Sequence, residues 1–124
     1  MASETGHKGQ VAELAVAFDL ANRYGYSISW PVPNDPFDLI ATRFTEIKRV
    51  QVKTVKHRIK DGKAWLVLDF TDGGGKRYEA GTVDLFAAYN PQDGRIFYLP
   101  FEDLNGARER WIDPKKIYQL GGSL

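Results

Sequence analysis

The chain contains no cysteine. This absence excludes disulfide bonds, thiolate metal ligands and a cysteine nucleophile, and it suits a reducing compartment. No apolar run approaches the length of a membrane span, and the first ten residues, MASETGHKGQ, lack the apolar core of a secretion signal. The formal net charge is only +1, so the overall charge points to no particular partner. We therefore expect a cytoplasmic protein with no membrane partner.

The composition is that of a folded globular chain. Of the 124 residues, 43 % are hydrophobic and 13 % are aromatic, which is enough for one hydrophobic core and too little chain for two. No repeat or change in composition marks a boundary. We expect a single domain over residues 1–124.

The first predicted element is a helix over residues 8–24. Its apolar residues recur at steps of three and four, the stripe of an amphipathic helix: Val11, Leu14, Ala15, Phe18 and Ala21. Gly25 is expected to end the helix.

The rest of the chain is predicted to be mostly strands. Residues 26–30, 37–42 and 46–55 have strand composition, and the last two are expected to form a hairpin. The run AWLVLDF, residues 64–70, is typical of a central strand covered on both faces. After a glycine-rich connector, VDLFAAYN and RIFYLP are two more strands separated by the turn PQDG, and FEDL is one helical turn. A helix followed by about five strands predicts an α/β (α+β) fold.

The stretch RVQVKT, residues 49–54, places two polar side chains between valines. Strand side chains alternate, so if Val50 and Val52 face the core, Gln51 and Lys53 share the opposite face. Pairing with the strand at 37–42 brings the Asp38 carboxylate beside the Gln51 amide. Carboxylate, amide oxygen and ammonium together suit hydrolysis of a phosphodiester with Mg²⁺, which needs few protein carboxylates. The alternatives are a solvated strand face for Gln51 and Lys53, and a turn residue for Asp38.

Together with Glu13 on the helix, these residues resemble the PD-(D/E)XK nuclease superfamily. Glu13 lies in KGQVAELAVAFDLANRYGY, Asp38 in PFDLIA, and Gln51 and Lys53 in VQVKT. Within the superfamily, the Q-x-K form is similar to the compact homing endonucleases encoded by group I introns. The likeness covers roughly residues 8–104. Two positions depart from the common pattern: Phe37 stands in place of Pro, and Gln51 in place of Asp or Glu.

The resemblance implies a restriction-endonuclease-like fold, a mixed sheet of about five strands flanked by helices. It implies a Mg²⁺-dependent DNA endonuclease, with Mn²⁺ as a substitute ion. Asp38, Gln51 and the Val52 carbonyl would be the metal ligands. Lys53 would hold the attacking water, and Glu13 would supply a further acid. Double-strand cleavage by a domain of this size implies a homo-oligomer, a dimer or tetramer.

A basic stretch adjoins this predicted site and is expected to contact DNA phosphates. The predicted DNA-binding residues, all basic and close in sequence, are Lys48, Arg49, Lys56, His57, Arg58 and Lys60, with Lys76 and Arg77 as a second group. The alternative is a hairpin edge kept soluble by lysines. Asp84 begins a later strand and is interpreted as a structural hydrogen-bonding residue.

Three other functions stay open at this point. A Holliday-junction resolvase shares the helix Glu and strand Asp, but usually keeps an acid where Gln51 stands. A DNA-binding protein with a disabled nuclease site is the alternative outside enzymes. A nuclease of a restriction or defence system would differ mainly in its genomic neighbours.

Overall fold

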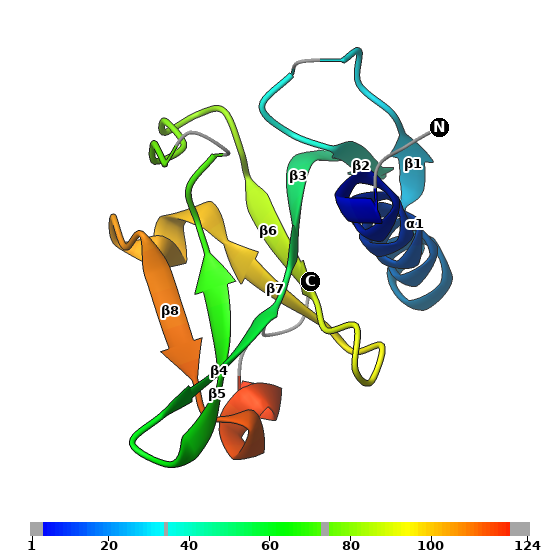
Figure 1. The fold of residues 1–124 in the computed structure, drawn as a ribbon. Helices are drawn as coiled ribbons and strands as arrows, with labels where there is room; N and C mark the ends of the chain where they lie inside the picture. Colours follow the sequence, from blue (N-terminus) through cyan, green and yellow to red (C-terminus); the bar gives the residue numbers. More distant parts are fainter. Residues whose placement is uncertain (1–3, 34, 73–74, 120–124) are drawn as a thin grey trace.

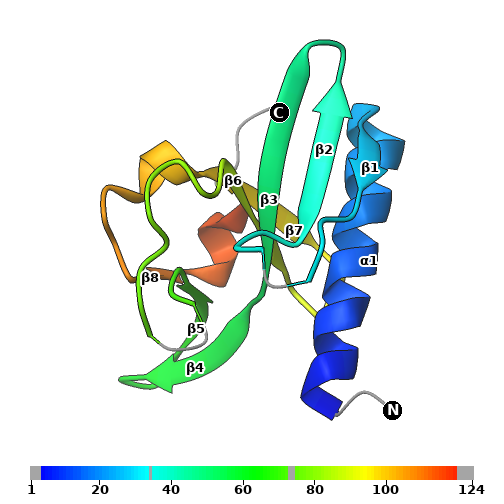
Figure 2. The ribbon, with the colours of Figure 1, turned by 90° about the horizontal axis from the view of Figure 1, so that it is seen from above.

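The computed structural model describes residues 4–33, 35–72 and 75–119. Figures 1 and 2 show three layers: one α-helix, a five-stranded sheet and a three-stranded sheet. The helix is α1 (Glu4–Tyr24), and the strands of the larger sheet, in spatial order, are β1 (Ser27–Ser29), β2 (Leu39–Arg43), β3 (Glu46–Thr54), β6 (Leu85–Tyr89) and β7 (Ile96–Pro100). The smaller sheet contains β4 (Lys56–Lys60), β5 (Lys63–Asp69) and β8 (Glu109–Ile112). Two 3₁₀ helices, η1 (Phe101–Leu104) and η2 (Pro114–Gln119), complete the described elements.

The larger sheet is mixed, as predicted. Strands β1, β2 and β3 are antiparallel neighbours, β3 and β6 are parallel, and β6 and β7 are antiparallel. The predicted hairpin is confirmed, because Leu39 on β2 pairs with Val50 on β3. The turn between β6 and β7 and the helical turn at FEDL are also found where the sequence predicts them. No helix in the described part of the chain is long and apolar enough to cross a membrane.

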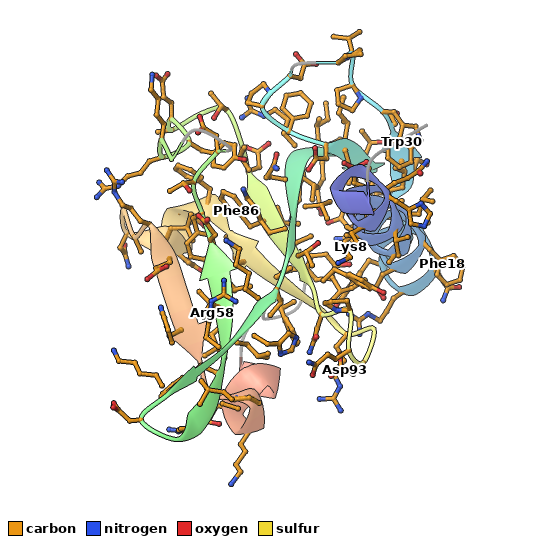
Figure 3. The ribbon with its side chains drawn as sticks, viewed as in Figure 1. Lys8, Phe18, Trp30, Arg58, Phe86 and Asp93 are labelled. Atoms are coloured by element: carbon orange, nitrogen blue, oxygen red, sulfur yellow. The ribbon has the colours of Figure 1, made fainter. Side chains whose placement is uncertain are left out.

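Side chains that alternate along the strands of the larger sheet belong to two separate hydrophobic cores. On β6, Leu85 and Ala87 pack towards α1, whereas Phe86 and Ala88 pack towards the smaller sheet. Figure 3 shows Phe86 between the two sheets. Its ring lies 5.3 Å from that of Phe70, which follows β5. The larger sheet is therefore buried on both faces, by the helix on one side and by the second sheet on the other.

The second sheet differs from the prediction. One face of the larger sheet is covered by strands, where the family resemblance predicted flanking helices. The run at residues 64–70 is the central strand of this smaller sheet, as β5, and takes no place in the larger one. Strand β4 was not predicted, because KHRIK has no apolar alternation. Its hairpin with β5 turns at Asp61 and Gly62, both with positive φ, and an Asp-Gly pair is a strong signal for such a turn.

Helix α1 is confirmed, but the predicted apolar face was wrong. The stripe against the sheet consists of Ala12, Val16 and Leu20, each at most 1 % exposed. The larger residues of the predicted stripe lie on the outer side, with Leu14 54 % and Phe18 69 % exposed. Phe18 points away from the sheet in Figure 3. The helix carries two stripes at helical spacing, and periodicity alone does not choose between them.

The end of the helix is as predicted. Gly25 has a φ of 75° and its N–H donates to the carbonyl of Ala21, 3.2 Å away. A positive φ of this kind favours glycine and allows the chain to reverse. The chain turns into β1, which pairs with β2 and brings the start of β2 close to the helix.

Candidate active site

Asp38 immediately precedes β2, and two hydrogen bonds join it to the neighbouring strand β3. Its N–H donates to the Val50 carbonyl at 2.8 Å, and its Oδ2 accepts from the Val52 N–H at 2.9 Å. Because Leu39 pairs with Val50 in this antiparallel pair, the residue before it, Asp38, falls opposite Gln51. The hairpin therefore places Asp38 beside Gln51, as the sequence predicted.

Glu13 reaches the same point from the helix. Its carboxyl group and that of Asp38 share a side-chain hydrogen bond. Burial raises the pKa of Glu13, and the nearby Asp38 carboxylate raises it further. Burial also raises the pKa of Asp38, although the Val52 N–H, the Lys53 charge and the hydrogen bond from Glu13 act in the opposite direction. Glu13 is therefore harder to ionise while Asp38 is charged, and the pair is a place where a cation would be favourable.

Gln51 lines a cleft of about 470 Å³ together with Asp38. Its amide Nε2 donates to the Val52 carbonyl oxygen at 3.5 Å, so the two predicted ligand groups are adjacent, with the amide nitrogen and not the amide oxygen facing the carbonyl. In the described residues, no group of three or more His, Cys, Asp or Glu side chains can hold a metal ion. An ion here would need the Gln51 amide oxygen, a main-chain carbonyl and waters beside the acid pair. This all-oxygen donor set fits Mg²⁺, which retains several waters in proteins.

Lys53 lies on the same face of β3 as Gln51, but this face is not in open solvent. The aliphatic part of the side chain lines a small apolar cavity with Leu68, Phe86 and Phe97. The ammonium group donates to the Thr71 carbonyl at 2.6 Å. Burial lowers the pKa of Lys53, and carboxylates nearby partly restore it. A solvated strand face therefore does not describe Lys53.

Sequence reasoning missed Tyr78, Asp69 and Asp72, which surround Lys53. The Lys53 Nζ atom lies 5.0 Å from the centre of the Tyr78 ring. Asp69, Asp38 and Asp72 all raise the pKa of Lys53. Asp69 has the largest effect of the three, followed by Asp38 and then Asp72. Asp69 also lies 3.6 Å from the ammonium of Lys56. Residues 71–82 have no hydrophobic period, so no sequence signal placed them at the site.

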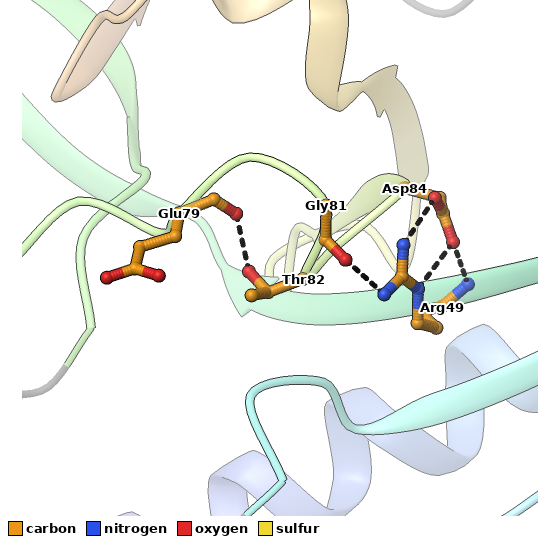
Figure 4. A network of polar contacts seen from close by, with 5 residues as sticks. All are labelled: Arg49, Glu79, Gly81, Thr82 and Asp84. Atoms are coloured by element: carbon orange, nitrogen blue, oxygen red, sulfur yellow. Dashed lines mark hydrogen bonds and ion pairs between the residues drawn. The ribbon is translucent and has the colours of Figure 1, made fainter.

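Arg49 and Asp84 form a closed pair, shown in Figure 4. The Arg49 main-chain N–H donates to Asp84 Oδ2 at 2.8 Å, and its guanidinium donates to both carboxylate oxygens at 2.9 and 3.0 Å. The Gly81 carbonyl accepts from the same guanidinium. Arg49 lowers the pKa of Asp84 through these hydrogen bonds. The geometry agrees with a structural role for Asp84, and it holds Arg49, a predicted DNA-binding residue, against the protein.

The other predicted DNA-binding residues lie in three places. Lys56, Arg58 and Lys60 alternate along β4 and are all exposed, with Lys56 nearest the site. Figure 3 shows Arg58 on this strand. His57 points the other way, and its Nε2 lies 3.1 Å from Asn90 Oδ1.

Lys76 and Arg77 are exposed and line the same cleft as Asp38 and Gln51. Lys48 is farther away, on the helix side of β3. Its Nζ atom lies 6.0 Å from the centre of the Tyr26 ring. The structure therefore brings Lys76 and Arg77 to the site and leaves Lys48 outside it.

The mixed sheet with its covering helix is a restriction-endonuclease-like fold. Asp38 and Gln51 line its cleft, Glu13 meets Asp38 from the helix, and Lys53 lies on the same strand as Gln51. The sequence model of the PD-(D/E)XK endonuclease family matches residues 3–113, and the chain belongs to this family. The fold is similar to the solved structure of a bacterial homing endonuclease, I-Ssp6803I. The TM-score is 0.74 at 21 % identity, covering 89 % of this chain and 78 % of that one. A search of curated proteins found no match.

Proposed function

We propose that this endonuclease hydrolyses phosphodiester bonds of DNA with Mg²⁺, in the manner of a homing endonuclease. One observation carries the proposal: Asp38, fixed opposite Gln51 in a cleft, is hydrogen-bonded to Glu13, and Lys53 lies on the same face of β3 as Gln51. Two carboxyl groups with raised pKa values are costly for a fold, and a divalent cation would relieve that cost.

Asp38, Gln51 and the Val52 carbonyl would hold the ion, and Mn²⁺ is expected to substitute. When bound, the ion would polarise the phosphate and make a bound water more acidic. Lys53 orients the attacking water and offsets negative charge on the phosphate. With an ion bound, the charged form of Glu13 would be favoured, any proton on it would pass to solvent, and Glu13 would orient water from the helix side.

The reaction is an in-line displacement at phosphorus. The water oxygen forms a new bond to phosphorus, and the bond from phosphorus to the 3′ oxygen breaks. The attacking water loses a proton to solvent and the leaving 3′ oxygen takes one from solvent, so the products are a 5′-phosphate and a 3′-hydroxyl. Lys53 is the nearest cationic group on β3 that can stabilise the added charge.

We propose that Lys56, Arg58 and Lys60 contact the DNA backbone in a row. Alternate residues of a strand are spaced by about 6.8 Å, and three exposed cations in line suit a run of phosphates. Lys76 and Arg77 contact phosphates at the cleft, with His57 and Lys48 at the margins. Replacing Lys60 by Ala should lower DNA affinity for all sequences and reduce the salt dependence by about one ion. Arg49 is expected to contribute least, since Asp84 already binds its guanidinium.

We also propose a homo-oligomer, a dimer or tetramer, because one site cuts one strand. The outer stripe of α1 supports this, with Val11, Leu14 and Phe18 at least 40 % exposed. The three residues recur at steps of three and four, a spacing that lets a second helix pack along them. Sedimentation of the wild type and of Phe18→Ser tests the proposal. It is wrong if the wild type sediments as a monomer at all concentrations and with DNA bound.

The activity is tested by cleavage of supercoiled plasmid and of a four-way junction. Wild type, Asp38→Ala and Lys53→Ala are compared in Mg²⁺, Mn²⁺ and EDTA. Asp93→Ala and Lys116→Ala are the matched controls, since both residues are exposed and outside the site.

We expect metal-dependent cutting by the wild type and both controls, and none by the two site variants. A preference for junctions would favour a resolvase over a homing-type enzyme. A folded wild type that binds DNA but never cuts would make it a binding protein on a nuclease fold.

A further inference from the structure

The glycine-rich connector between β5 and β6 carries two predicted DNA-binding residues, Lys76 and Arg77, but the sequence assigns it no part in positioning the catalytic residues. Its described residues fold back on themselves beside the site. Thr71 and Arg77 form an isolated antiparallel bridge, and the Asp72 N–H donates to the Lys76 carbonyl at 2.7 Å. This turn brings Thr71 and Tyr78, seven positions apart in sequence, both into contact with the Lys53 ammonium.

The two connector residues contact Lys53 in different ways. The Thr71 carbonyl accepts a hydrogen bond from Nζ at 2.6 Å, and the Tyr78 ring lies 5.0 Å from the same atom. Both contacts favour the charged ammonium, one through a dipole and one through the ring quadrupole. A lysine side chain has several freely rotating bonds, so two fixed contacts at its end restrict it strongly.

Tyr78 is itself held in place from behind. Its ring packs edge-on against Phe86, with centroids 5.4 Å apart, and Phe86 is 1 % exposed. Phe86 pairs with Gln51 across the parallel strands β3 and β6. Tyr78 also lines the cleft that contains Asp38 and Gln51. Its position is thus fixed by β6, the strand that neighbours β3 and its proposed metal ligands.

The Tyr78 hydroxyl does not supply a charge at this site. Burial, together with the acids nearby, raises the pKa of Tyr78 to about 12, so the group stays neutral. Asp69 and Asp72 lie on the connector side of Lys53, and both attract its ammonium. A lysine without the ring contact could turn towards these acids and away from Asp38.

We propose that Tyr78 is a positioning residue for the proposed nuclease reaction. Its ring holds the Lys53 ammonium on the Asp38 side of the cleft, where the attacking water and the phosphate would lie. This inference rests on the proposed function, because Lys53 must act in cleavage for its position to matter. The aromatic face carries the effect and the hydroxyl does not.

The test compares Tyr78→Phe, which keeps the ring, with Tyr78→Leu and Tyr78→Met, which remove it. Met fills the space beside Phe86 with a flexible side chain, and so guards against a variant that fails to fold. Single-turnover cleavage is measured with saturating DNA and Mg²⁺, and DNA affinity is measured separately in Ca²⁺. Tyr78→Phe should cleave within about twofold of wild type, and the ring-less variants about tenfold more slowly with unchanged affinity.

A second readout does not need activity. Protons of the Lys53 side chain next to Nζ lie over the ring, so their NMR signals should be shifted upfield by its ring current. The shift should persist in Tyr78→Phe and vanish in the Leu and Met variants.

The outcomes separate the two proposals. If the shift is present but no variant, including wild type, cleaves DNA, the nuclease proposal fails while the contact stands. If wild type cleaves and Tyr78→Phe is as slow as Tyr78→Leu, the hydroxyl is the active group and the positioning proposal is wrong. Equal cleavage by all variants also overturns it.

Discussion

Replacing Asp38 by Asn should make the metal-free protein more stable while abolishing cleavage. Asn has the same shape, and its amide oxygen can still accept the Val52 N–H that now binds Asp38 Oδ2. The substitution removes a negative charge that burial disfavours and that raises the pKa of Glu13. Lys53 loses one counter-charge, but the raised pKa of Asp38 shows that the ionised form is disfavoured on balance.

The size of the gain follows from the two carboxyl groups. Two unit charges roughly 4 Å apart repel by about 1 kcal/mol in water and by about 4 kcal/mol at an effective dielectric constant of 20. Glu13 is partly exposed, so the lower end applies, and we expect a gain of about 1 kcal/mol near pH 8 in EDTA.

The gain should depend on pH in a definite direction. Both carboxyl pKa values are raised above 3.8 for Asp38 and 4.5 for Glu13, so the folded state holds protons that the unfolded state has lost. The free energy of unfolding therefore falls as the pH rises from about 4 through the raised values. In Asp38→Asn, the part of this fall that comes from ionising Asp38 is absent. The free energies of unfolding of the two proteins should therefore become equal near pH 4.

The assay is urea unfolding in EDTA from pH 4 to pH 8. Asp61→Asn is the matched control, because it removes the same charge from an exposed turn where Asn is equally suited. Mg²⁺ titration by calorimetry should show binding to wild type and none to Asp38→Asn. The reasoning is refuted if Asp38→Asn is less stable than wild type at pH 8, because Asp38 would then be a structural cap.

Three further substitutions probe other parts of the structure. Gln51→Glu adds a carboxyl group beside Asp38 and Glu13, so calorimetry should show tighter Mg²⁺ binding, and urea unfolding in EDTA should show lower stability; unchanged Mg²⁺ affinity would place Gln51 outside the metal site. Arg49→Met removes the partner of Asp84 and should lower the urea midpoint while DNA affinity changes little; a large loss of affinity would instead show a DNA contact. Val16→Ala in the core should cost about 2 kcal/mol, whereas Val11→Ala on the outer stripe should cost less than about 0.5 kcal/mol, both measured by urea unfolding. Equal costs would contradict the orientation of the helix.

The sequence was sufficient to predict the arrangement of Asp38 against Gln51. Strand periodicity put Gln51 and Lys53 on one face, and the hairpin register brought Asp38 beside them. These are local properties, because a side-chain period of two and a short hairpin leave few alternatives. The role of the assembled residues remains a prediction.

The sequence could not predict which face of α1 packs against the sheet, or which residues lie around Lys53. Two apolar stripes on the helix satisfy the same spacing, and only packing against the sheet selects the one with Val16. Tyr78 comes from a connector without periodicity, so its place beside Lys53 depends on a tertiary fold-back. Strand β4 was missed because polar strands leave little trace in a hydrophobic pattern.

The passage from β3 to β4 has a consequence for changing the target of this enzyme. Val55 alone separates the two strands; it is 3 % exposed, and its N–H donates to the Tyr89 carbonyl at 2.8 Å. Figure 2 shows one continuous ribbon through both sheets. The proposed catalytic lysine and the proposed DNA-contacting row thus lie on two consecutive strands. No loop between the strands can absorb a change in length. Retargeting would have to exchange side chains along β4, because one inserted or deleted residue before it would turn the whole row to the opposite face.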